Sequence, residues 1–112
     1  MEANEVYTVE RVEKVTAVTD KTIEGDPVPT GKVLCINFMS VLDITTASKA
    51  VKLGYLKENT QHFFKRLAVG ASAYGTELDG TLYLVEGEKP ICQVESPTVG
   101  DEIRFYVRGV YV

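Results

Sequence analysis

The sequence predicts an all-β fold, an antiparallel β-sandwich or jelly roll of about seven to eight strands. From Gly31 to Val112, short runs of alternating apolar and polar residues follow one another, and turn-forming residues separate them. A chain of 112 residues, 45% hydrophobic and 25% charged, suits a single two-layer core. No segment shows a convincing helical period, so we expect two packed sheets.

Before this region, valine recurs at every third position, a spacing that matches neither a strand nor a helix. These valines are interleaved with threonine and charged residues, and their branched side chains favour extended structure. A strand would place Val6, Val12 and Val18 on one face and Val9 and Val15 on the other. Both faces would then need cover, either from a neighbouring subunit or from the domain itself.

The next segment, residues 20–31, is rich in turn formers and contains Pro27 and Pro29. Two prolines separated by one residue disfavour regular strand pairing, so we expect a surface loop. The resulting division is an extended N-terminal arm and linker at residues 1–28 and a β-sandwich domain at residues 29–112.

Residues 32–43 alternate strongly, yet both faces are mostly apolar, as expected for a central strand covered on both sides or meeting a partner chain. The last strand, residues 102–108, should turn Ile103, Phe105 and Val107 inward, and residues 109–112 complete the chain. Residues 70–80 read as a long loop. The other strands are expected at residues 49–57, 61–69, 81–86 and 91–95, with a short helix as the alternative at residues 61–69.

Two parts of the chain are candidates for subunit contact. The alternating arm offers apolar side chains, and the outward side of the last strand offers tyrosine and arginine, which are common in interfaces. A solvated strand face is the alternative for the second group. The interface candidates are Val6, Val9, Val12, Val15, Arg104, Tyr106 and Tyr111.

Charge and residue content argue against several partners and activities. A net charge of -4 with scattered lysines and arginines disfavours nucleic acid. No apolar run approaches the roughly 18 to 20 residues needed to cross a membrane. The acidic start of the chain, Met1-Glu2, is unlike a secretory signal, so we expect synthesis in a cytoplasm.

The chain also lacks an obvious reaction centre. Its single histidine, His62, has neither an orienting partner nor a nucleophile nearby in the sequence. One histidine with two distant cysteines, Cys35 and Cys92, does not make a zinc site. We expect free buried thiols, with a disulfide possible only in an oxidising compartment. No catalytic residue, cofactor or metal is predicted, and the protein is expected not to be an enzyme.

Three short motifs carry a resemblance across residues 29–112. Pro29-Thr30-Gly31-Lys32 leads into a strong strand, Leu53-Gly54-Tyr55 lies in a later one, and Gly100-Asp101-Glu102-Ile103 begins the closing strand. The chain thereby resembles the small jelly-roll-like structural proteins of tailed bacteriophage virions, such as head decoration proteins, head fibres and tail-fibre modules.

This resemblance implies a non-enzymatic virion subunit made in the host cytoplasm. Such a subunit would associate with itself, as a trimer, and dock on a major capsid or tail protein. The alternative is a carbohydrate- or receptor-binding adhesion module that uses tyrosines and acidic loops.

Overall fold

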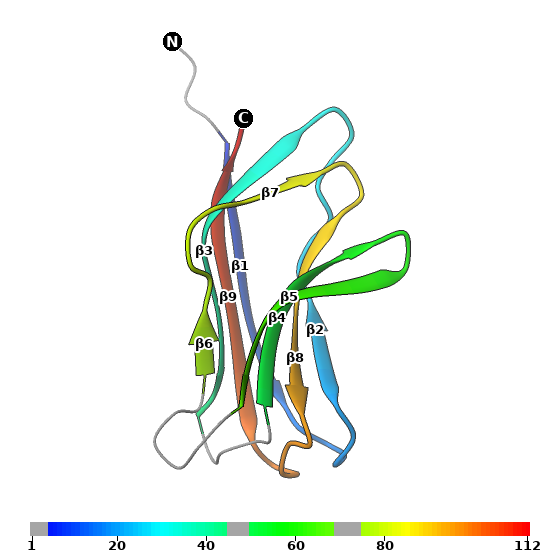
Figure 1. The fold of residues 1–112 in the computed structure, drawn as a ribbon, viewed down its shortest axis with the longest axis vertical. Helices are drawn as coiled ribbons and strands as arrows, with labels where there is room; N and C mark the ends of the chain where they lie inside the picture. The colour runs from blue at the N-terminus through cyan, green and yellow to red at the C-terminus, as the bar shows by residue number, and fades with distance from the viewer. Residues whose placement is uncertain (1–4, 45–49, 69–74) are drawn as a thin grey trace.

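The computed structural model describes residues 5–44, 50–68 and 75–112, which form two antiparallel sheets packed face to face (Figure 1). The first sheet has the order β1-β9-β3-β6, with β7 also paired to β3, and the second has the order β2-β8-β4-β5. The strands are β1 (Val6–Lys14), β2 (Lys21–Glu24), β3 (Val33–Asp43), β4 (Ala50–Lys57), β5 (Thr60–Ala68), β6 (Gly75–Glu77), β7 (Leu82–Val85), β8 (Lys89–Glu95) and β9 (Glu102–Tyr111).

The order of the strands is that of a jelly roll. β7 pairs with the first half of β3 and β6 with the second half, so the two act as one interrupted edge strand. With β6 and β7 taken together, each sheet has four strand positions, and the chain passes between the sheets at every connection except the β4–β5 hairpin. The predicted antiparallel β-sandwich is therefore confirmed.

Residues 6–14 and 21–24 form strands of the sandwich, whereas residues 1–28 were predicted to be an arm and linker. β1 pairs with β9 from Val6 to Lys14, and β2 pairs with β8 at the edge of the other sheet. β2 also lies within the segment expected to be a loop. It is only four residues long, and its buried Ile23 gives too short a pattern to stand out among turn-forming neighbours.

The valine pattern of β1 follows the alternation expected of a strand. Val9 and Val15 are buried in the core, while Val6, Val12 and Val18 are exposed. The predicted assignment of faces is confirmed, and among the described residues only the inner face of this strand is covered.

A β-bulge in β3 explains why both of its faces look apolar in the sequence. The pairing of β3 with β9 shifts register between Ile36 and Phe38. Before the shift Leu34 and Ile36 are buried, and after it Met39 and Val41 are buried. One extra residue thus moves the apolar set from even to odd positions, and a single face of the strand meets the core.

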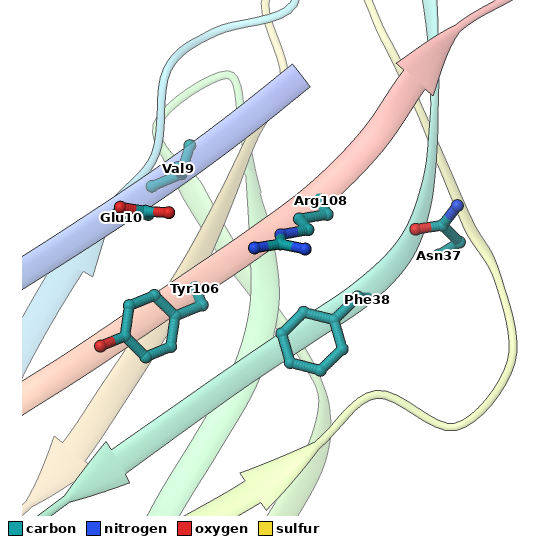
Figure 2. A pocket seen from close by; sticks show the side chains of 6 residues that line it. All are labelled: Val9, Glu10, Asn37, Phe38, Tyr106 and Arg108. Atoms are coloured by element: carbon teal, nitrogen blue, oxygen red, sulfur yellow. The ribbon is translucent and has the colours of Figure 1, made fainter. Parts of the chain in front are cut away.

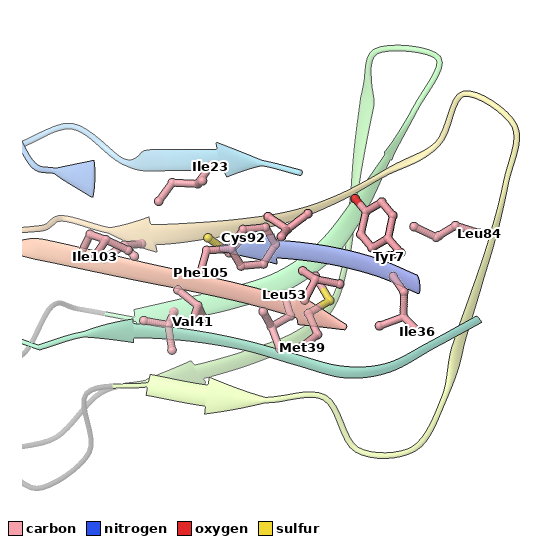
Figure 3. Packing of buried hydrophobic residues seen from close by; sticks show 14 of the residues in the cluster. Tyr7, Ile23, Ile36, Met39, Val41, Leu53, Leu84, Cys92, Ile103 and Phe105 are labelled. Atoms are coloured by element: carbon pink, nitrogen blue, oxygen red, sulfur yellow. The ribbon is translucent and has the colours of Figure 1, made fainter. Parts of the chain in front are cut away.

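The core fills the space between the two sheets (Figure 3). Phe105 on β9 is its largest fully buried side chain, and Ile103 and Val107 point inward beside it as predicted. Two other expectations need correction. β6 lies inside the predicted loop at residues 70–80, of which residues 70–74 lie outside the described part, and β8 begins at Lys89, two residues before the strand predicted at residues 91–95.

Tyr7 and Cys92 should make the stability of the fold sensitive to alkaline pH. The Tyr7 hydroxyl donates a 2.6 Å hydrogen bond to the carbonyl oxygen of Asp26, and burial raises the pKa of both Tyr7 and Cys92. A raised folded pKa stabilises the fold fully below the unfolded value, about 8.5 for cysteine and about 10 for tyrosine, and the stabilisation is lost as pH rises.

We expect the free energy of unfolding in urea to fall from about pH 9 upward, by up to about 1.4 kcal/mol per pH unit for each ionising group. Tyr7→Phe should cost about 1 kcal/mol at pH 7, because a hydrogen bond is lost, and should make the decline above about pH 10 shallower. An equally steep decline in this variant would contradict the assigned role of Tyr7.

Candidate interaction face

The outward side chains of β1, β9 and β3 form rows across one broad surface, which we call the outer face of the first sheet. Strand register places Thr8, Arg108 and Phe38 in one row. The next row along the strands begins with Glu10 and continues through Tyr106 to Ser40. The row after it consists of Val12, Arg104 and Leu42.

A hollow of about 550 Å³ lies on this outer face, where the first two rows meet (Figure 2). Tyr106 and Arg108 project from β9 between β1 and β3, and Phe38 lies beside them on β3. Phe38 is 38% exposed, although phenylalanine is usually buried. The hollow is lined by Val9, Glu10, Asn37, Phe38, Tyr106 and Arg108.

Apolar side chains continue on the outer face beyond the hollow. Val6 and Val12 on β1 are 71% and 54% exposed, and Leu42 on β3 is also exposed. Tyr83 and Val85 extend the same surface onto β7. Exposed apolar groups gathered on one side of a small domain are typical of a surface that contacts another molecule.

Two arginines give this face positive charge, and they differ in whether an acidic side chain is paired with them. Arg104 is paired with Glu102 at 3.1 Å, and that hydrogen bond raises the pKa of its guanidinium, which therefore stays charged. Arg108 is exposed and has no ion pair among the described residues. Its guanidinium is available to a carboxylate or carbonyl group of a partner.

The outer face of the second sheet has the opposite character. A single row crosses all four strands through Thr22, Gln93, Lys52 and Arg66. Gln93 donates to Thr22 at 3.0 Å, Lys52 donates to Gln93 at 3.2 Å, and Arg66 donates to Glu95 at 2.7 Å. These polar groups hydrogen-bond to one another, and the Lys52 ammonium lies 5.0 Å from the centre of the Phe63 ring, so the row needs no further partner.

The predicted interface residues separate into two groups. Val6 and Val12 lie on the outer face, as do Arg104 and Tyr106, and their contact with a partner stays a prediction. The side chains of Val9, Val15 and Tyr111 are on the inner side instead, although Val9 is also among the residues that line the hollow. The two valines are core residues, and the Tyr111 ring meets the Tyr7 ring edge-on at 5.9 Å.

Strand parity explains why Tyr111 points inward. It lies an even number of residues from the inward-facing Phe105 and Val107, whereas Tyr106 lies an odd number away. Phe38, Leu42 and Arg108 were missed as site residues. Their signal is the alternation of Phe38, Ser40 and Leu42, which the bulge in β3 separates from the inward-facing residues before it.

Among the residues that the structure describes, His62, Cys35 and Cys92 do not form a cluster. The His62 ring stacks on Tyr55 at 5.0 Å in the β4–β5 hairpin, and Cys35 and Cys92 are both free. In the described ranges, no three histidine, cysteine or acidic residues are grouped so as to hold a metal ion. The same residues include no helix long and apolar enough to span a bilayer.

Comparison with known proteins supports the fold. No protein-family model matches the chain, and no curated protein does. Among solved structures, the chain is similar to one in the acidic stable capsid structure of Helicobacter pylori bacteriophage KHP30. The TM-score is 0.66 at 15% sequence identity, and the match covers 98% of this chain and 94% of the other. The two chains therefore share one fold over nearly their whole lengths.

Proposed function

We propose that this protein is a non-enzymatic structural component of a bacteriophage virion, a capsid decoration or fibre-type subunit. The observation that carries the proposal is the likeness to a chain of a phage capsid, because it extends over almost all of both chains. The jelly-roll topology supports it, since this fold recurs in viral capsid proteins. The three motifs that resemble virion structural proteins point the same way.

The outer face of the first sheet is the surface proposed to dock on the larger assembly, a major capsid or tail protein. Its exposed Phe38, Leu42 and Tyr106 offer apolar contact, and Arg108 offers a charge-assisted hydrogen bond. The polar second sheet would then face solvent. The subunit is also proposed to associate with itself, and the resemblance to decoration proteins implies a trimer.

Mass spectrometry of purified virus particles from the source culture tests the virion role directly. The protein is expected in the particle fraction at a fixed ratio to the major capsid or tail protein through successive density gradients. Recovery only from the unassembled fraction of the lysate would overturn the proposal.

Phe38→Ala should weaken binding to particles that lack the protein by about tenfold, since central aromatic side chains often dominate an interface. Phe64→Ala is the matched control, because Phe64 is similarly exposed, at 43%, but lies on β5 of the second sheet. Co-sedimentation of each purified variant with such particles measures the effect. Equal binding of both variants would exclude the outer face of the first sheet as the docking surface.

A carbohydrate- or receptor-binding role is the second candidate, favoured by the content of the hollow. Phe38 and Tyr106 supply aromatic rings, while Glu10, Asn37 and Arg108 supply hydrogen-bonding groups. A glycan array separates the two functions. Selective binding of a sugar that Tyr106→Ala abolishes would support adhesion, whereas particle binding without glycan binding supports the structural role.

A further inference from the structure

β1 is the sheet edge best suited to pairing with another chain. It is nine residues long, lies at the end of its sheet, and pairs with β9 without a register shift (Figure 1). The other edges are protected, because β2, β6 and β7 have only four, three and four residues and the β4–β5 pairing contains a bulge. β1 also contains no proline.

The backbone groups along the free edge of β1 belong to its even-numbered residues. The carbonyl oxygen of Glu5 accepts from the Tyr111 amide at 2.9 Å, and the Val15 amide donates to Asp101 at 2.8 Å. In an antiparallel pair, residues alternate between facing the partner strand and facing away. Odd-numbered residues therefore bond to β9, and Val12 presents its N–H and C=O to the free edge.

The sequence around Val12 is complementary to itself when reversed. If Val12 of one copy faces Val12 of a second copy, Glu10 faces Lys14 and Arg11 faces Glu13. Val9 would then face Val15, which lies one residue beyond the end of β1. Opposite charges directly across an antiparallel pair stabilise it.

Neighbouring registers that use the same backbone groups place like charges opposite each other. A shift of the two-fold axis by one residue sets Arg11 against Arg11 or Glu13 against Glu13. A shift by two residues sets Glu10 against Glu10 or Lys14 against Lys14. Like charges directly opposite destabilise a strand pair, so of these five registers only the one centred on Val12 avoids every such clash.

We propose that two copies of the protein pair antiparallel through β1, with the two-fold axis at Val12. The first sheet of one copy then continues into the first sheet of the other, and the outer faces of these two sheets form one surface. Glu10 and Lys14 are exposed and form no ion pair within the described residues. Within each copy, Arg11 pairs with Asp26 and Glu13 pairs with Lys21, both at 2.8 Å. In the dimer, Arg11 of one copy would face Glu13 of the other, which would link the two ion pairs across the interface.

This inference extends the self-association in the proposed function, but it requires only the purified full chain. It predicts a dimer in solution, where the resemblance to decoration proteins implies a trimer. Because no capsid takes part in its test, a negative result leaves the particle-recovery experiment unaffected.

Charge reversal tests the register. Sedimentation equilibrium should show a dimer for the natural sequence, and Glu10→Lys or Lys14→Glu should each raise its dissociation constant about tenfold or more, since two symmetric attractive pairs become repulsive. The double variant Glu10→Lys/Lys14→Glu should recover dimerisation to within about threefold. A monomeric or trimeric natural protein, or a double variant as weak as the single ones, would overturn the proposal.

A cross-linking experiment identifies the axis independently. In a Cys35→Ser background, Val12→Cys should form a disulfide-linked dimer on mild oxidation, because facing Cα atoms about 5.5 Å apart lie within disulfide range. Thr8→Cys is the matched control on the same edge, because the proposed register keeps its two introduced thiols far apart. Equal cross-linking at both positions would refute the register, and circular dichroism of each variant checks that it is folded.

Discussion

Replacing Phe105 by alanine is expected to lower the free energy of unfolding by about 3–5 kcal/mol, which for a domain of this size would leave little stability. Phe105 is fully buried on β9, the strand that pairs with both β1 and β3. Its removal would open a cavity at the centre of the sandwich, among side chains held by two sheets. Equilibrium unfolding in urea, followed by circular dichroism, measures the loss.

Phe38→Ala and Phe64→Ala serve as controls for the size of the side chain removed. Both rings are at the surface, so each substitution should cost no more than about 1 kcal/mol. A loss at Phe105 no larger than the loss at these two positions would contradict the assignment of β9 as the centre of the core.

The inner face of β9 shows what alternation alone can predict. Ile103, Phe105 and Val107 occupy every second position of a regular strand, and all three are buried. A period of two carries this information locally, without knowledge of which strands lie alongside. The outward positions of Arg104 and Tyr106 follow from the same period.

Two short strands were not predicted in this way, although β7, also of four residues, lies within a predicted strand. β2 and β6 span only four and three residues, too few to establish a period, and each exists because a longer strand pairs with it. β2 pairs with β8, which lies much further along the chain. A second non-local pairing, of β1 with β9, incorporates residues 6–14 into the sandwich, where local sequence suggested an arm.

The candidate interaction face was predicted in part for a related reason. Val6 and Val12 could be assigned to one face from the sequence of β1 alone, but that this face is exposed could not. Phe38 and Leu42 could not be separated from the inward residues of β3, because the bulge after Ile36 reverses parity within one strand. The position of the hollow also depends on how β1, β9 and β3 are aligned with one another, and the sequence of one strand alone does not determine that alignment.

Glycines next to the two bulges mark the changes in parity, which the alternation of apolar and polar residues does not reveal. Gly109 on β9 faces Ile36 at the bulge in β3, and Gly54 lies at the register shift between β4 and β5. A side chain at Gly109 would overlap the carbonyl oxygen of Cys35, and one at Gly54 would overlap that of His62. A glycine inside a strand pattern is thus a marker of close backbone approach, and hence of a change in parity.

Gly54→Ala is therefore expected to destabilise the protein by about 2–3 kcal/mol, through steric overlap with the backbone of β5. The His62 carbonyl belongs to a paired strand and cannot move aside as a flexible side chain can. Gly80→Ala provides the contrast. Gly80 has open space around it but a φ of +92°, so the variant should pay only for backbone strain, about 1 kcal/mol.

Urea unfolding of the two glycine variants and the natural protein separates the two costs. A larger loss of unfolding free energy for Gly54→Ala than for Gly80→Ala, together with faster proteolysis of the β4–β5 hairpin, would show that the bulge requires a residue without a side chain at position 54. If Gly54→Ala were as stable as the natural protein, β5 could not approach β4 as closely as the structure shows. The parity change at this bulge would then need another cause, because glycine would not be required there.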